Sequence, residues 1–158
     1  MHAMDGLHAV NEQDVIGQEH WTHKGEVRLF LWEKYVGQPS NDKGTILFVH
    51  GSSMASQPTF DLQVDGRPFS SVMNWFAVRG FDTWCVDMEG YGRSDKHRDL
   101  NCDISNGADD LNAACEYICR TRNIDQVHLP FHWLSRRRNQ CYVINVGTVK
   151  IERVVILF

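Results

Sequence analysis

The chain has 158 residues, of which 42% are hydrophobic and 23% are charged, and its formal net charge is −4 at pH 7. This length and composition are those of one globular domain that is large enough to bury a core. The negative charge excludes recognition of nucleic acid or of an anionic membrane through overall charge, so we expect neither partner.

The five cysteines are an odd number, and the first ten residues lack the basic and apolar segments of a secretory signal. No apolar run approaches the roughly 20 residues that a membrane-spanning helix needs. These features predict free thiols, a reducing compartment and a cytoplasmic protein. No Cys or His group has a zinc-site spacing, and we expect no metal and no cofactor.

The chain opens with residues 1–18, which show no clear period and predict a loose N-terminal arm. Hydrophobic residues then alternate with polar ones around Val27, Leu29 and Leu31, which is the period of a strand. A turn at 23–26 and a first strand near 19–22 complete an expected antiparallel hairpin.

The next stretch, residues 44–54, reads GTILFVHGSSM. Its apolar run 45–49 predicts a short strand that is buried on both faces. The His50-Gly51 pair and the small residues after it allow a sharp turn that leaves backbone N–H groups free. A helix at 70–79 and a strand at 81–86 follow, and this strand–helix–strand order predicts parallel pairing.

A second motif, DMEGYGRS, occupies residues 87–94. It fails the dinucleotide-binding pattern because Asp95 stands where the third Gly or Ala belongs, and it contains no Walker Gly-Lys-Ser/Thr. Taken by itself, Asp87 is interpreted as a carboxylate that anchors its loop by accepting backbone hydrogen bonds. We single out four positions as a structural motif: Asp87, Gly90, Gly92 and Ser94.

The most strongly periodic helix spans residues 103–122. Apolar residues recur there every three or four positions, and Cys115 and Cys119 are interpreted as small core residues. Asp109 and Asp110 are placed early and Arg120 and Arg122 late, as the helix dipole favours. A further strand is expected at 126–129.

The His50-Gly51 loop and the D-x-x-G-x-G-x-S segment, separated by one strand–helix–strand unit, together resemble the α/β-hydrolase family. The resemblance covers residues 19–129. It implies an α/β fold, and more specifically part of the α/β-hydrolase fold. We therefore expect a mostly parallel sheet with an N-terminal antiparallel hairpin and flanking helices. It further implies an oxyanion loop at His50, Gly51 and Ser52, with the Ser52 N–H as donor, and a small-molecule ester or amide as substrate.

The resemblance ends where the family carries the G-x-S-x-G turn that presents its nucleophile. Aligned on the strand before it, Phe131 and Ser135 replace glycines and Trp133 occupies the nucleophile position. Tryptophan cannot attack a carbonyl, and the acid and histidine of the triad have no counterpart in the divergent tail 130–158. No catalytic residue is therefore assigned.

Two functions remain open from the sequence. One is a serine-type hydrolase by descent that is inactive as written, and the other is a non-catalytic fragment or pseudoenzyme that acts as a binding module. The resemblance covers only the front half of the family's domain, so the sheet would lack the strands of the second half. This would leave an open sheet edge and the apolar end 154–158, which predicts self-association.

The abrupt loss of the family pattern after Leu129 predicts a shifted reading frame, a mis-spliced exon or a truncated gene model, because gradual drift would leave a fading pattern. We expect a G-x-S-x-G motif in another frame of the encoding DNA near the codons for residues 130–135. Reading all three frames and the nearby downstream exons tests this, and finding no such motif would contradict it.

Overall fold

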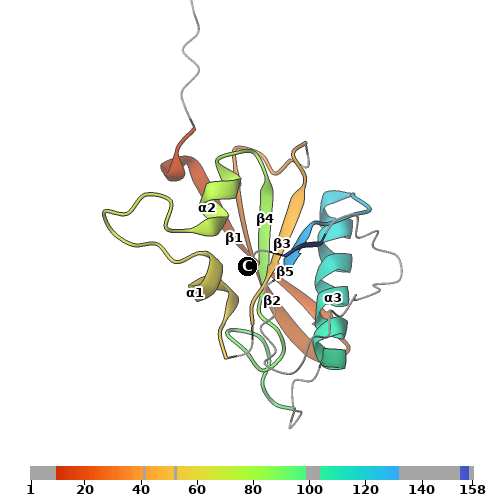
Figure 1. Cartoon of the computed structure of the whole chain (residues 1–158). Helices are drawn as coiled ribbons and strands as arrows, with labels where there is room; N and C mark the ends of the chain where they lie inside the picture. The colour runs from red at the N-terminus through yellow and green to blue at the C-terminus, as the bar shows by residue number, and fades with distance from the viewer. Residues whose placement is uncertain (1–9, 41, 52, 99–103, 132–153, 157–158) are drawn as a thin grey trace, which may run out of the picture.

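The computed structural model describes residues 10–40, 42–51, 53–98, 104–131 and 154–156 (Figure 1). They form one sheet with the strand order β1-β2-β4-β3-β5-β6. The elements in chain order are the short 3-10 helix η1 (Glu12–Asp14), β1 (Val15–Lys24), β2 (Val27–Val36), β3 (Thr45–Val49), α1 (Ser56–Phe60), α2 (Val72–Ala77), β4 (Asp82–Val86), α3 (Ile104–Arg122), β5 (Leu129–Phe131) and β6 (Val154–Ile156).

The N-terminal hairpin is longer than the sequence predicts. Strand β1 begins at Val15, four residues before the expected start, and it pairs along its whole length with β2. Ahead of it, the Asn11 side chain caps η1 by accepting from the Gln13 N–H at 2.8 Å. The start of β1 was missed because β1 lies at the edge of the sheet and most of its first residues are exposed, so they carry no apolar alternation.

The centre of the sheet is parallel, as predicted. Strands β3 and β4 pair in parallel from Thr45 opposite Asp82 to Val49 opposite Val86. On the other side of β4, however, strand β2 runs antiparallel to it. The described sheet is therefore mixed rather than mostly parallel, with three parallel pairings and two antiparallel ones.

Helices cover both faces of the sheet (Figure 1). Helix α3 closes one face over a core that includes Trp84, Leu111 and Ile118, whereas α2 closes the other over Phe48 and Met73. The expected helix at 70–79 is shorter in the structure, where Ser71 caps α2 by accepting from the Asn74 N–H at 3.0 Å.

The assignment of two acidic residues to the start of α3 was wrong. The helix begins at Ile104 and has no acidic residue in its first turn. Asp110 is fully buried. It lies four and eight positions before the buried Ala114 and Ile118, so it belongs to the stripe that faces the core.

The segment on the α1–α2 side is tied to the hairpin by a buried lysine. Lys34 on β2 extends its ammonium group to Asp61 Oδ1 at 2.5 Å and to Asn74 Oδ1 at 2.6 Å. The same Asp61 carboxylate accepts from the Trp32 indole N–H at 2.8 Å. A cation that is taken out of water in this way needs such partners.

A strand follows α3, as predicted, although it is displaced along the chain from the expected 126–129, and it lies beside β3. Pairing starts at His128, whose N–H donates to the Thr45 carbonyl at 2.8 Å, and β5 continues it to Phe131 opposite Val49. Beyond it, β6 adds in parallel to β5, within a tail to which the sequence analysis assigned no element of the family. Among the described helices, none is long and apolar enough to cross a membrane.

Candidate functional site

Parallel pairing of β3 and β4 brings two loops together at the carboxyl ends of these strands. The loop that begins at His50 follows β3, and the motif that begins at Asp87 follows β4. Ligands of open α/β sheets bind at this end of the strands. The two motifs that carry the resemblance in sequence are therefore neighbours in space.

His50 joins the two loops and is buried, with 1% of its surface exposed. Its Nε2 accepts the backbone N–H of Met88 at 3.1 Å, and its Nδ1 lies 2.8 Å from the Gly51 carbonyl. Because an N–H group can only donate, Nε2 must carry the lone pair and Nδ1 the proton. The imidazole is thus neutral and both nitrogens are occupied, which makes His50 a link between loops and not a free base.

The remaining positions of the expected oxyanion loop are only partly described. Gly51 follows His50 and is half-buried, whereas Ser52 lies outside the described residues. The next residue, Ser53, has a φ of 72°, in the left-handed region that non-glycine residues rarely adopt. The backbone thus turns sharply after β3, as the small residues of this loop predict.

Asp87 holds the second loop together from a buried position. Its Oδ1 accepts from the Ser56 N–H at 2.7 Å and from the Ser56 hydroxyl at 2.6 Å. Its Oδ2 accepts from the Arg93 N–H at 2.9 Å. Three donors leave this carboxylate little capacity to act as a nucleophile or a base, so its observed contacts are those of an anchor.

The glycines and the serine of the motif complete this anchor. Gly90 and Gly92 both have positive φ, of 87° and 48°. The Ser94 hydroxyl donates to the Asp87 carbonyl at 2.5 Å and accepts the Phe30 N–H of β2 at 2.8 Å. The loop is therefore fastened to the hairpin as well as to β3 and β4.

The position of the nucleophile lies just past the described part of β5. That strand ends at Phe131, opposite Val49, and so it delivers the chain to the same end of the sheet as the two loops. Trp133 and Ser135 lie outside the described residues. The structure thus describes the strand that precedes the residues aligned with the family's G-x-S-x-G turn (the elbow), and that alignment rests on the sequence alone.

Sequence reasoning missed a charged cluster beside the second loop. The buried Glu89 carboxylate binds the Lys24 ammonium at 2.9 Å and the Arg98 Nε at 2.6 Å. The hydrogen bond from Arg98, strengthened by Lys24, lowers the pKa of Glu89 to about 2. Lys24 also pairs with Asp110, which in turn accepts the Glu89 N–H at 2.9 Å. The one feature of the sequence that could have indicated this cluster is the helical spacing of Asp110 and Ala114, which places Asp110 on the face of α3 that packs against the core.

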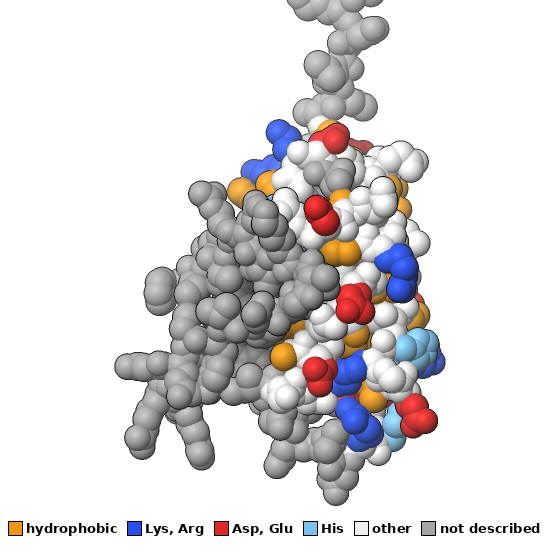
Figure 2. All heavy atoms as spheres, turned by 90° about the vertical axis from the view of Figure 1, so that its right-hand side faces the viewer, with side chains coloured by type: hydrophobic (Ala, Val, Ile, Leu, Met, Phe, Trp, Pro, Cys, Tyr) orange, Lys and Arg blue, Asp and Glu red, His pale blue; other side chains and the backbone are white. Residues whose placement is uncertain are grey.

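On the described part of the surface that Figure 2 shows, acidic and basic side chains are interspersed with hydrophobic ones. Among the described residues, no three His, Cys, Asp or Glu side chains are grouped so as to hold a metal ion. The described cysteines, Cys85, Cys115 and Cys119, are free thiols.

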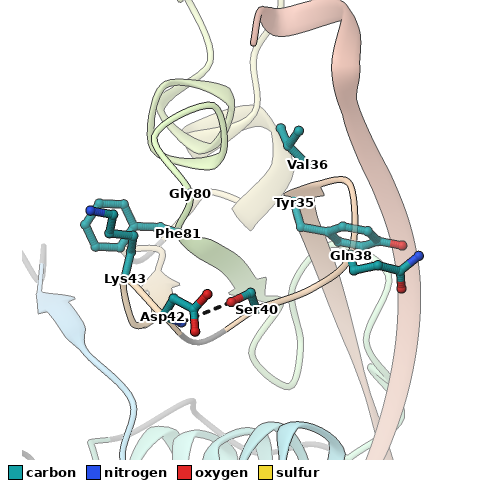
Figure 3. Close-up of a pocket in the computed structure, with 8 residues that line it drawn as sticks. All are labelled: Tyr35, Val36, Gln38, Ser40, Asp42, Lys43, Gly80 and Phe81. Atoms are coloured by element: carbon teal, nitrogen blue, oxygen red, sulfur yellow. Dashed lines mark hydrogen bonds between the residues drawn. The ribbon is translucent and has the colours of Figure 1, made fainter. Parts of the chain in front are cut away.

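A hollow of about 220 Å³ lies at the opposite end of the sheet (Figure 3). Its walls include Tyr35 near the end of β2, Asp42 and Lys43 before β3, and Phe81 before β4. It therefore lies at the amino ends of the parallel strands, away from both motifs. We do not assign it to the site formed by the two loops.

No protein-family model and no curated protein matches the sequence, but solved structures match its fold. A laboratory-evolved variant of a potato epoxide hydrolase is 22% identical and has a TM-score of 0.56, over 75% of this chain and 33% of that chain. The described fold is part of the α/β-hydrolase fold. An epoxide hydrolase from Vigna radiata is 17% identical and has a TM-score of 0.53, over 76% of this chain and 32% of that chain. A haloalkane dehalogenase from Agrobacterium tumefaciens is 16% identical and has a TM-score of 0.50, over 72% of this chain and 32% of that chain.

This chain therefore spans about a third of the length of each of these structures. At such low identity the likeness shows the fold and assigns no activity. It does confirm the partial α/β-hydrolase fold that the resemblance of the two motifs implied.

We expect Gly92→Ala to destabilise the protein more than Gly25→Ala. Both glycines have positive φ, of 48° and 58°, but an added Cβ at Gly92 would lie 2.0 Å from Asp87 Oδ2, whereas at Gly25 it would meet nothing within 4 Å. Gly25→Ala should cost about 1–2 kcal/mol for its backbone conformation. Gly92→Ala should cost about 1–3 kcal/mol more for the steric conflict. Denaturant unfolding measures both, and equal losses would contradict the anchoring role of Asp87.

We also expect Glu89→Gln to lose stability in a pH-dependent way. Because the pKa of Glu89 is lowered from 4.5 to about 2, its contribution is complete above pH 4.5 and is lost as the pH falls through about 2. At pH 7 the variant should be less stable by roughly 1–3 kcal/mol, and the difference should shrink below pH 4.5. The matched control is Glu26→Gln, at an exposed position of the hairpin turn. A difference that stays constant with pH would contradict the assignment.

Proposed function

We propose that this chain is an α/β hydrolase by descent that has lost serine-type catalysis and acts, if it acts, as a binding module. The observation that carries the proposal is Trp133, which stands at the nucleophile position two residues after the strand that lies beside β3. An indole offers no oxygen or sulfur that could attack a carbonyl.

The described residues around the site support this proposal, because none of them is a free acid or base. His50 uses both ring nitrogens to hold the loops, and Asp87 already accepts three hydrogen bonds. A second buried histidine, His20, lies on β1, four strands away from β5. At about 4.8 Å per strand this is roughly 19 Å, too far to serve a nucleophile at the elbow.

The proposal also concerns what the scaffold would recognise. If a small molecule binds between the loops, the resemblance favours an ester or an amide, although the names of the similar structures include epoxide hydrolases and a haloalkane dehalogenase. The fold alone does not choose among these bonds. A cytoplasmic location and self-association through an open sheet edge belong to the same proposal.

The purified 158-residue chain should not turn over activated short-chain esters, and a fluorophosphonate probe should not label Ser135. A lone oxyanion loop cannot compensate, because residual catalysis without a triad, about 10³–10⁴-fold over water, requires an intact binding site. The measurements are ester turnover and mass-spectrometric mapping of the probe, with the variant Ser135→Ala as control. Stoichiometric labelling at Ser135, or turnover that is lost in Ser135→Ala, would show that a serine site exists.

A further inference from the structure

A chain of hydrogen bonds below α3 plays no part in the proposed function. The Tyr117 hydroxyl of α3 lies 3.0 Å from His20 Nδ1 on β1. On the other side of the ring, His20 Nε2 lies 2.7 Å from Glu33 Oε2 on β2. The second carboxylate oxygen of Glu33 pairs with the guanidinium of Arg122 at the end of α3. Hydroxyl, imidazole and carboxylate thus follow one another in a line.

The direction of each proton can be assigned from chemistry. Glu33 is fully buried and pairs with Arg122, so it is ionised and can only accept. His20 Nε2 must then carry the proton that Glu33 accepts, and Nδ1 has the lone pair. The Tyr117 O–H therefore donates to His20 Nδ1.

The imidazole is held in place and is in the state that a base requires. Its ring packs at 4.5 Å from the Trp84 ring and at 5.8 Å from the Tyr117 ring. Burial, together with the nearby Arg122, lowers the pKa of His20, so the ring is neutral at pH 7. A neutral histidine whose tautomer is fixed by a buried carboxylate is the arrangement that activates a hydroxyl in the Ser-His-Asp triad.

We propose that Tyr117 is a nucleophilic hydroxyl, with His20 as its general base and Glu33 as the positioning residue, and that it accepts acyl groups from small activated donors. Phenols ordinarily ionise near pH 10, so a tyrosine without a base beside it is a poor nucleophile at pH 7. A base in contact with the hydroxyl therefore has its largest effect on the acylation rate near neutral pH. Tyr117 is only partly buried, so part of its side chain is exposed to a small donor in solution, whereas His20 beneath it is buried.

With N-acetylimidazole as donor, the step is an acetyl transfer. The Tyr117 oxygen attacks the carbonyl carbon while its proton passes to His20 Nδ1. The carbon–nitrogen bond of the reagent then breaks, and the leaving imidazole takes that proton. The products are O-acetyltyrosine and imidazole, and His20 returns to its neutral form.

The test compares two tyrosines of the same chain. Tyr35 is the internal control, because its hydroxyl donates to the Gln18 amide oxygen at 3.3 Å and therefore contacts no base. The native protein is treated with N-acetylimidazole at pH 7, and the acetylation rate of each tyrosine is followed by peptide mass spectrometry. Tyr117 should react roughly 10–100-fold faster than Tyr35. General-base catalysis typically contributes about 10²–10⁴-fold, and we expect the lower end or less because the protein does not bind and orient the donor.

Two further results should accompany this difference. In His20→Gln the rate at Tyr117 should fall to that of Tyr35, while the rate at Tyr35 stays unchanged, and Tyr117→Phe should remove the fast phase alone. Acetylation at Tyr117 that is no faster than at Tyr35 in the native chain, or that is equally fast in His20→Gln, would overturn the proposal.

The pH dependence of the native chain provides a test that no folding defect can obscure. The charged groups that surround His20 are Glu33 on β2, Asp82 on β4 and Arg122 on α3, with the Arg120 guanidinium 5.9 Å from the Tyr117 ring. The rate at Tyr117 should level off once His20 is neutral, whereas the rate at Tyr35, which has no base beside its hydroxyl, should keep rising as the pH increases. Parallel rises at both tyrosines would overturn the proposal. Tyr117 and Ser135 lie in different peptides, so this outcome is independent of the fluorophosphonate test.

Discussion

The parallel register of β3 and β4 is the constraint on which the rest of the site depends. Since Val49 lies opposite Val86, the next residues, His50 and Asp87, leave the sheet side by side. The hydrogen bond from the Met88 N–H to His50 then becomes possible, and through it each loop fixes the other. A slip of one residue would turn the side chains of a strand to the opposite face and break this contact.

The sequence predicts best what short-range physics determines. Strand β3 has its expected bounds and β4 differs from the expected 81–86 by one residue. All ten residues of the two strands are buried, and a fully buried strand appears in the sequence as an uninterrupted short run between turn residues. The hairpin turn at Gly25 is equally local. Asp87, Gly90 and Gly92 could be singled out for the same reason, because their spacing belongs to a single loop.

The features that were missed depend on contacts between residues far apart in the chain. Tyr117 meets His20 across 97 positions, and Arg122 meets Glu33 across 89. No period or motif announces such a pair, because each partner alone has the pattern of an ordinary polar residue on a strand or helix. Asp110 shows the same limit: a rule about helix dipoles placed it at the helix start, but burial against Lys24 explains its position.

The missed contacts share one architectural role, which is to fasten the hairpin to elements that arrive later in the chain. Lys24 reaches the loop after β4 and helix α3, Lys34 reaches the segment between α1 and α2, and Glu33 binds Arg122 at the end of α3. Replacing a buried ion pair with apolar residues is often neutral or stabilising, so such pairs are poor sources of net stability, but breaking one leaves a buried charge without its partner. Any arrangement that docks the hairpin in another register would therefore leave several buried charges without partners at once. The contacts that hold the described loops in place involve neither a nucleophile nor a free base, so the fold of this part of the chain does not depend on catalytic residues.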